Sequence, residues 1–156
     1  MVQNKPILSR GLFYTLSWTW GFIMTIIGAL VVGCIKIYGL FAKKTFKLKK
    51  HGYCYYLNIG KSWGGIELGM FFLTDSRDSN ATKWHEHGHG IQNCFWGPLM
   101  PFVICIPSAT RYWYREFKYN RKGLNPPTTY DSIWFEKDAT MTGRKYRKYF
   151  AEVVSR

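Results

Sequence analysis

The stretch His85-Glu86-His87-Gly88-His89 contains an HExxH motif, whose residue types and spacing suit zinc hydrolysis. In a helix, His85 and His89 lie one turn apart on the same face, so both imidazoles can bind one tetrahedral zinc ion. Glu86 projects about 100° from His85, close enough to reach a water on the metal without binding the metal itself. The motif therefore predicts two neutral nitrogen ligands, an open coordination position and a carboxylate general base.

The same five residues have a simpler interpretation, because short motifs arise by chance and a histidine-rich stretch is often a solvated polar helix. His87 points away from the face shared by His85 and His89, and we do not expect it to bind metal. A zinc site of this type needs a third protein ligand. That ligand has to come from a later part of the chain.

Glu136 is the strongest candidate for the third ligand. It follows two aromatic residues, so its helix has an apolar side that can pack against the motif helix. Two histidines, one glutamate and a water around zinc form a hydrolytic arrangement. The other downstream carboxylates have separate explanations, as a residue among surface cations, a helix cap and a residue of the basic tail: Glu116, Asp131 and Glu152.

The composition favours a membrane protein of one domain's length, with 156 residues. A net charge of +13 indicates an anionic partner, either nucleic acid or the negative face of a membrane. Aromatic residues make up 19% of the chain, and Trp and Tyr in such numbers are typical of membrane interfaces. We therefore predict a lipid bilayer with anionic headgroups as the partner. The cysteines show no CxxC pair and are expected to be free thiols: Cys34, Cys54, Cys94 and Cys105.

Residues 11–35 contain no charged side chain. As one helix they would rise about 37 Å, enough to cross a ~30 Å hydrocarbon core. The pattern predicts a transmembrane helix, with residues 1–41 as a membrane anchor and residues 42–156 as a membrane-associated domain. A signal peptide cleaved near Cys34 is the alternative, although the apolar region is longer than such peptides use.

The charges on either side of this segment predict its orientation. Lys5 and Arg10 precede it, and more lysines follow it, so the positive-inside rule places the N-terminus outside and the chain after residue 36 in the cytoplasm. The following lysines would also hold the chain on anionic lipid. They are Lys36, Lys43, Lys44, Lys47, Lys49 and Lys50.

Ahead of the motif, residues 53–59 and 66–74 are rich in aromatic and β-branched side chains and are separated by a glycine-rich turn. This pattern predicts a β-hairpin. The polar run 75–80 then supplies N-cap residues for the motif helix, which we expect from about Asn80 to Asn93.

Behind the motif, residues 94–108 are strongly apolar but contain three prolines, which disfavour one regular spanning helix. A full crossing would also place the two histidines and Glu136 on opposite sides of the bilayer. We therefore predict a re-entrant or interfacial segment. Residues 109–122 mix aromatic rings with cations and predict a helix in the headgroup region, with RNA binding as the alternative. A last helix is expected from Tyr130 or Asp131.

These motifs resemble those of the gluzincins, and most closely membrane-embedded relatives similar to the prenyl-protein peptidases, in which HExGH precedes a Glu-x-x-Ala-Asp helix. Residues 85–89 match HExGH, and Glu136-Lys137-Asp138-Ala139 matches Glu-x-x-Ala. The next residue is Thr140 instead of Asp, so either Thr140 or Asp138 would orient a zinc-bound histidine. The resemblance implies a minimal zincin-like α+β membrane protein. Its edge strand would hold an extended substrate, and residues 66–74 lie in the corresponding place.

The chain also resembles a group of short bacterial and phage membrane proteins over roughly residues 50–143. They carry HExGHxxQ, an apolar segment bounded by Gly-Pro and Pro-Ser, and Glu-Lys-x-Ala, here residues 85–92, 97–108 and 136–139.

We therefore predict a membrane-anchored zinc metallopeptidase-like hydrolase, with Zn²⁺ on His85, His89 and Glu136 and with Glu86 as general base. The alternative is a non-catalytic membrane protein with a structural zinc site or a degenerate motif. A membrane-associated peptide would be a suitable substrate for the hydrolase. Three residues are equal candidates for stabilising an oxyanion: His51, Tyr112 and Tyr130.

Overall fold

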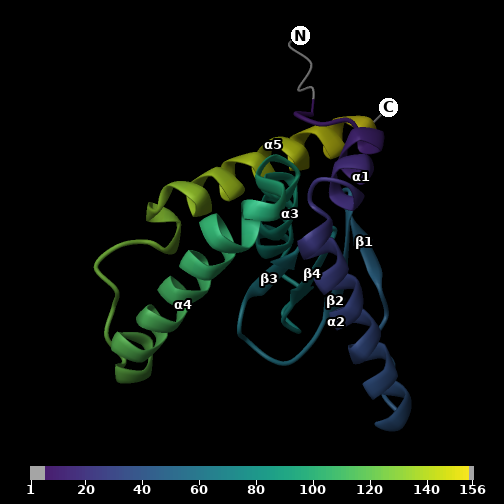
Figure 1. The fold of residues 1–156 in the computed structure, drawn as a ribbon. Helices are drawn as coiled ribbons and strands as arrows, with labels where there is room; N and C mark the ends of the chain where they lie inside the picture. The colour runs from purple at the N-terminus through teal and green to yellow at the C-terminus, as the bar shows by residue number, and fades with distance from the viewer. Residues whose placement is uncertain (1–5, 155–156) are drawn as a thin grey trace.

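The computed structural model describes residues 6–154, and Lys5, one of the two cations expected to precede the membrane segment, lies outside the described residues. The fold is α+β, with a four-stranded sheet that contacts α2 and α3 (Figure 1). The long helices are α1 (Arg10–Trp18), α2 (Phe22–Phe41), α3 (Asn80–Trp96), α4 (Ile106–Lys118) and α5 (Trp134–Val154). The strands are β1 (Lys49–His51), β2 (Cys54–Asn58), β3 (Gly65–Leu68) and β4 (Phe71–Thr74).

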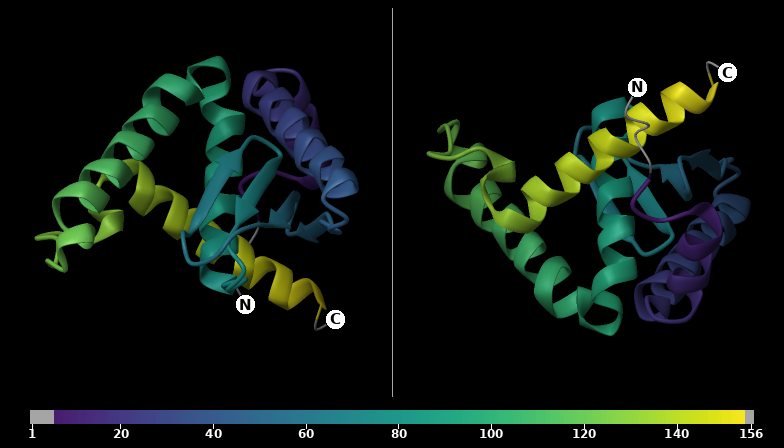
Figure 2. Two further views of the ribbon diagram at one scale, coloured as in Figure 1. Left: turned by 90° about the horizontal axis from the view of Figure 1, so that it is seen from below. Right: turned by 90° about the horizontal axis from the view of Figure 1, so that it is seen from above.

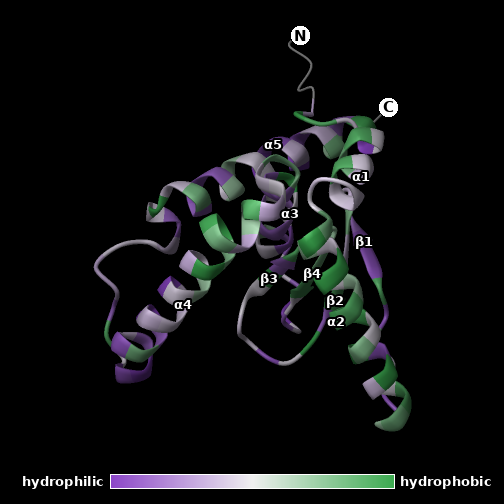
Figure 3. Ribbon diagram, in the orientation of Figure 1, coloured by the Kyte–Doolittle hydropathy of each residue, from purple (hydrophilic) through white to green (hydrophobic). Residues whose placement is uncertain are grey.

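The prediction of one continuous helix over residues 11–35 is wrong. The chain breaks at Thr19-Trp20-Gly21, between α1 and α2. The side-chain amide of Asn93 donates to the carbonyl of Gly21 at 3.1 Å, and a Cβ on Gly21 would lie only 2.4 Å from that nitrogen. A contact with α3 thus fixes a break that the apolar pattern does not reveal. α2 alone is long and apolar enough to cross a membrane, and its ribbon is coloured hydrophobic over much of its length in Figure 3.

The predicted hairpin between residues 53–59 and 66–74 is also wrong. The sheet order is β1-β2-β4-β3, in which β2 pairs in parallel with β4 while β3 and β4 form an antiparallel hairpin. Gly69 has a φ of +72° and lies between β3 and β4, and its N–H donates to the buried carboxyl group of Glu67. Glycine adopts this backbone conformation without strain, so the expected second strand divides in two. The division leaves β3 as an edge strand.

Residues 94–108 are helical along almost their whole length. α3 continues to Trp96, and a 3-10 turn (Gly97–Leu99), a π-helix (Pro101–Cys105) and α4 follow. Pro98, Pro101 and Pro107 all occupy first or second positions of helical segments, where the missing N–H is tolerated. The prolines therefore start helical segments here and do not exclude them, while the path of this segment relative to a membrane stays a prediction.

The remaining elements follow the sequence-based expectations closely. The predicted motif helix is confirmed and extends to Trp96, with Ser79 as its N-cap. Residues 109–122 form most of α4 and a 3-10 turn, Asn120–Lys122. The last helix begins later than predicted, because Tyr130–Ser132 form a separate 3-10 turn before α5. All four cysteines are free.

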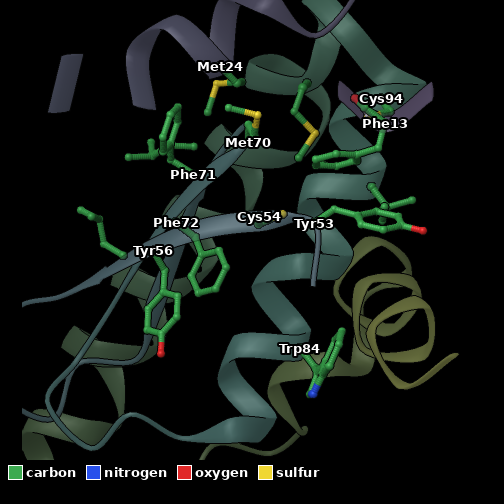
Figure 4. Close-up of a cluster of buried hydrophobic side chains, with 14 of the residues drawn as sticks. Phe13, Met24, Tyr53, Cys54, Tyr56, Met70, Phe71, Phe72, Trp84 and Cys94 are labelled. Atoms are coloured by element: carbon green, nitrogen blue, oxygen red, sulfur yellow. Dashed lines mark hydrogen bonds between the residues drawn. The ribbon is translucent and has the colours of Figure 1, made fainter. Parts of the chain in front are cut away.

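The hydrophobic core joins the N-terminal segment to the rest of the chain. Figure 4 shows Phe13 of α1 and Met24 of α2 in the same cluster as Tyr53 and Phe72. The N–H of Leu8 also donates to the hydroxyl of Tyr146 in α5 at 2.9 Å. Residues 8–41 therefore share one core with the later elements, and the proposed boundary at residues 41 and 42 stays a prediction.

Candidate metal centre

The structure brings the three predicted metal ligands together. Nε2 of His85 lies 3.0 Å from Oε2 of Glu136, and Nε2 of His89 lies 3.2 Å from the same oxygen. Potential ligand atoms of all three residues lie within 4.8 Å of one another, so the cluster could hold a metal ion. Two of these residues come from α3 and the third from the first turn of α5.

Two of the separations in the cluster can be compared with those of a tetrahedral metal site. In a tetrahedral site with metal–ligand distances of 2.0–2.1 Å, the ligand atoms are about 3.3 Å apart. The observed separations of 3.0 and 3.2 Å are close to that value. These two separations are compatible with ligand atoms that share one metal ion, and all three ligand atoms lie within 4.8 Å of one another.

The hydrogen bonds of Gln92 identify the tautomer of His89. The amide nitrogen of Gln92 donates to Asp138 at 2.8 Å and to the carbonyl of Phe135 at 2.9 Å. The amide oxygen of Gln92 therefore faces Nδ1 of His89, 2.7 Å away, and accepts a hydrogen bond from it. Nε2 of a neutral His89 then carries the lone pair that a metal needs.

The partner of His85 is Thr140. Nδ1 of His85 lies 2.9 Å from Oγ1 of Thr140, on the same face of α5 as Glu136. The sequence offers either Thr140 or Asp138 as the residue that orients a histidine. In the structure each of them positions a different histidine. Thr140 contacts His85 directly, whereas Asp138 acts on His89 through Gln92.

Glu136 is fully buried. Burial raises the pKa of its carboxyl group, but the contacts with His85, His89 and Ser108 outweigh burial and hold the pKa below its ordinary range. The hydroxyl of Ser108 in α4 donates to Oε1 of Glu136 and lies 3.2 Å from the hydroxyl of Tyr130. One oxygen of the carboxyl group is therefore turned toward the histidines, and the other is held by Ser108.

Glu86 lies beneath the first residue of β3. A Cβ on Gly65 would be 2.5 Å from Oε1 of Glu86, so only glycine leaves room for this carboxyl group. Burial raises the pKa of Glu86 to about 7; the charge of His85 opposes this shift and that of Glu136 adds to it. The predicted general base thus lies between the edge strand and the ligand cluster.

Two glycines allow α3 and α5 to approach closely. A Cβ on Gly88 would lie 2.0 Å from the carbonyl oxygen of Ala139, and a Cβ on Gly143 would lie 2.0 Å from that of Trp84. Backbone therefore packs against backbone at both positions. This contact is what brings Glu136 within reach of the two histidines.

The cluster opens into a cavity of about 820 Å³ between β3, the π-helix and α4. Most of its wall is apolar, and the polar groups gather around the ligands. Tyr112 and Tyr130, two of the candidates for stabilising an oxyanion, line this cavity. The third, His51, lies elsewhere, with its ring packed against Trp84 at a centroid distance of 4.2 Å.

His87 lies away from the cluster, as expected. Its Nε2 accepts a hydrogen bond from the backbone N–H of Tyr53 at 3.2 Å, and burial lowers its pKa to about 3. It is therefore a neutral structural residue in the core.

Four residues of the site were not identified from the sequence as site residues. In the sequence, Gln92 is noted only as the last residue of the HExGHxxQ match. Its position three residues after His89 nevertheless places it on the same helix face. Ser108 marks only the boundary of an apolar segment. Gly65 and Glu67 line the cavity from β3. Their approach depends on strand pairing that no local pattern reveals.

No family model, curated protein or solved structure matches this chain, so its function has to be inferred from the geometry of its own residues.

Proposed function

We propose that the protein is a zinc-dependent hydrolase of peptide bonds that binds Zn²⁺ through His85, His89 and Glu136. The observation that carries the proposal is the contact between His89 and Glu136. Gln92 makes Nε2 of a neutral His89 an acceptor, yet this nitrogen faces a carboxylate oxygen 3.2 Å away. Two acceptors at this distance repel each other unless a cation or a proton lies between them.

The residues around the cluster supply the other functions that hydrolysis needs. A zinc ion in this place would polarise a substrate carbonyl and a water molecule. Glu86 accepts a proton from the attacking water and afterwards delivers it to the leaving amine. Tyr112 and Tyr130 line the cavity and can donate hydrogen bonds to a developing oxyanion.

The edge strand β3 supports a peptide as the substrate. Its Gly65 and Ile66 line the cavity beside Glu86, and its outer edge faces no other strand of the described sheet. An extended peptide can pair with such an edge through its backbone groups. The sequence predicts that residues 66–74 hold the substrate. In this proposal only β3, Gly65–Leu68, has that role.

Metal analysis tests the ligand set. Purified wild-type protein and Glu86→Gln should contain about one zinc per chain, and His89→Ala and Glu136→Ala should contain far less. Glu116→Ala is the matched control, because Glu116 is a carboxylate on another helix whose side chain faces Arg121, 3.9 Å away. Equal zinc content in all variants would show that the ligand assignment is wrong.

Glu86→Gln separates a hydrolase from a protein with a structural zinc site. If Glu86 is the general base, this variant keeps its zinc and loses about 100-fold or more of its rate on a peptide substrate. In a structural site, Glu86→Gln would behave like the wild type, whereas His85→Ala would lower stability. The close tie between α3 and α5 through Glu136 is the observation that favours this second candidate.

A further inference from the structure

Two turns of the chain meet at one end of the molecule. α1 runs beside α3, where the Sγ of Cys94 lies 3.6 Å from the hydroxyl of Ser17. Both helices end at the same place, and there the indole N–H of Trp20 donates to the carbonyl of Phe95 at 3.2 Å. Both views in Figure 2 show the α1–α2 turn next to the turn that follows α3.

Large apolar side chains at this end are exposed, between 42% and 68% of each. No Asp, Glu, Lys or Arg occurs in residues 11–35 or 94–110, which form the two turns and the helices beside them. A contiguous apolar surface without charge is typical of contact with another apolar phase. We call this surface the apolar apex: Trp18, Trp20, Phe22, Phe95, Leu99 and Phe102.

The flanking cations lie on the helices that converge on the apex, outside the parts of these helices that form it. Arg10 begins α1, Lys36 lies near the end of α2, and Arg111 lies beyond the first turn of α4. Leu8, just before α1, is hydrogen-bonded to Tyr146 in the basic half of α5. These cations therefore lie around the uncharged region, but away from the apolar apex itself.

α2 as a whole is long and apolar enough to cross a membrane, but its uncharged part is shorter than a hydrocarbon core. Residues 22–35 rise about 21 Å as a helix, against a hydrocarbon core of ~30 Å. A crossing would also expose the aromatic apex to water on one side. Because α1 runs back from the apex along α3, it would place Arg10 at the depth of the hydrocarbon, where a cation is unfavourable.

We propose that the apolar apex inserts into one leaflet of an anionic bilayer and that α2 lies inclined in this leaflet without crossing it. The whole of α2 rises about 30 Å, so a tilt of about 60° from the membrane normal confines it to ~15 Å, the depth of one leaflet. Tryptophan rings suit this boundary, and Arg10, Lys36 and Arg111 reach the headgroups.

In this arrangement Leu8 and α5 lie on the same side of the membrane as the chain after α2. This topology differs from the one that the positive-inside rule predicts. That rule places the N-terminus outside and the chain after residue 36 in the cytoplasm. The inference does not depend on whether the metal centre is catalytic.

Side-specific labelling tests the topology. Single cysteines replace exposed cations in the variants Arg10→Cys, Lys44→Cys and Lys148→Cys, each in a Cys34→Ala background because Cys34 is the exposed native thiol. A membrane-impermeant maleimide is applied to spheroplasts and to inverted membrane vesicles of expressing cells. All three cysteines should react in the same preparation. Labelling of Arg10→Cys and Lys44→Cys from opposite sides would mean that α2 crosses the membrane, and the proposal would be wrong.

Vesicle binding tests the surface itself. Leu99 at the apex and Leu124 in a distant loop are equally exposed, at 54% and 55%, so Leu124→Glu is a matched control for Leu99→Glu. On vesicles of phosphatidylcholine and phosphatidylglycerol, Leu99→Glu should lower the partition coefficient at least about tenfold, and Leu124→Glu should leave it unchanged within about twofold. Equal binding of the two variants would contradict the proposal. So would a detergent-free dimer that buries Leu99, or a soluble monomer that binds no vesicles.

Discussion

At the scale of single residues, hydrogen bonds from other residues orient the side chains of the candidate metal centre. Asp138 and the carbonyl of Phe135 fix the amide group of Gln92, and Gln92 in turn fixes His89. This chain of contacts selects the nitrogen that faces Glu136. Partners of this kind commonly change metal affinity although they do not touch the metal.

Replacing Gln92 should therefore weaken zinc binding while leaving the ligands in place. We expect Gln92→Leu to raise the zinc dissociation constant about 10- to 100-fold, measured by competition with a chromogenic chelator. Asn120→Leu, at an exposed position in the 3-10 turn after α4, serves as control and should bind zinc like the wild type. An unchanged affinity of Gln92→Leu would show that His89 does not need this partner.

Glu67 is a second buried carboxyl group in the cavity wall. Burial raises its pKa well above 4.5; the N–H of Gly69 opposes this shift, and Glu86 adds to it. Among residues 6–154, its Oε2 finds no hydrogen-bond partner. The folded protein therefore keeps Glu67 protonated at a pH where the unfolded chain has released the proton.

This pKa shift predicts how stability changes with pH. Below about pH 4.5, Glu67 is protonated in both the folded and the unfolded protein. As the pH rises toward the pKa of Glu67 in the folded protein, only the unfolded protein releases the proton. The wild type therefore loses stability over this range. Glu67→Gln should match the wild type near pH 4 and exceed its free energy of unfolding at pH 7–8. Denaturant titrations over this range measure the difference, and Glu116→Gln, which changes a half-buried carboxylate outside the cavity, should show none. A Glu67→Gln variant less stable than the wild type at pH 8 would refute the prediction.

At the scale of elements, the contact between α3 and α5 decides whether a site exists. The histidines project from α3, and Glu136 is useful only because α5 passes close to that face. Gly88 and Gly143 allow backbone contact at two places along this pair of helices. The glycine of the HExGH motif therefore has a packing function, separate from the chemistry of its neighbours.

Adding one methyl group at Gly88 should separate these helices. The new Cβ of Gly88→Ala would lie 2.0 Å from a backbone oxygen, which cannot rotate away as a side chain can. We expect a loss of about 1–3 kcal/mol in the free energy of unfolding, together with weaker zinc binding. Gly33→Ala is the matched control, because nothing lies within 4 Å of its new methyl group, and it should be neutral or slightly stabilising. Equal stabilities of the two variants would argue against the close contact.

At the scale of the whole molecule, the metal centre joins segments that are distant in the chain. α5 holds the N-terminal segment through Tyr146 and offers Glu136 to α3. A zinc ion bound between α3 and α5 would therefore stabilise the whole fold and not only the site.

Removal of metal should consequently lower the melting temperature of the wild type. With free zinc at about 100 times its dissociation constant, binding contributes about 2.7 kcal/mol, which corresponds to roughly 5–10 °C for a chain of this size. Thermal unfolding with and without EDTA measures the change, and Glu136→Ala should show no such shift. The same shift in both proteins would mean that EDTA acts at another place.

The sequence by itself was sufficient to select the three residues that meet in the candidate metal centre, and to predict most of the helices. The HExxH spacing predicts two histidines on one helix face, and Glu136 could be chosen because the other carboxylates had local explanations. The motif helix follows from the HExxH motif and the N-cap residues before it, and the helix expected within residues 109–122 follows from their mixture of rings and cations, which are local properties. Helices of this kind can be predicted from the residues next to one another in the chain.

Only the tertiary structure decided the break at Gly21, the division of residues 66–74 and the orienting roles of Gln92 and Thr140. Each depends on a partner far away in the chain, respectively Asn93, the parallel pairing with β2, and the helix α5. A local pattern records which side chains are apolar or polar, but not which distant backbone approaches them. For this reason the ligands could be identified from the sequence, whereas the shape of the cavity and the apolar apex could not.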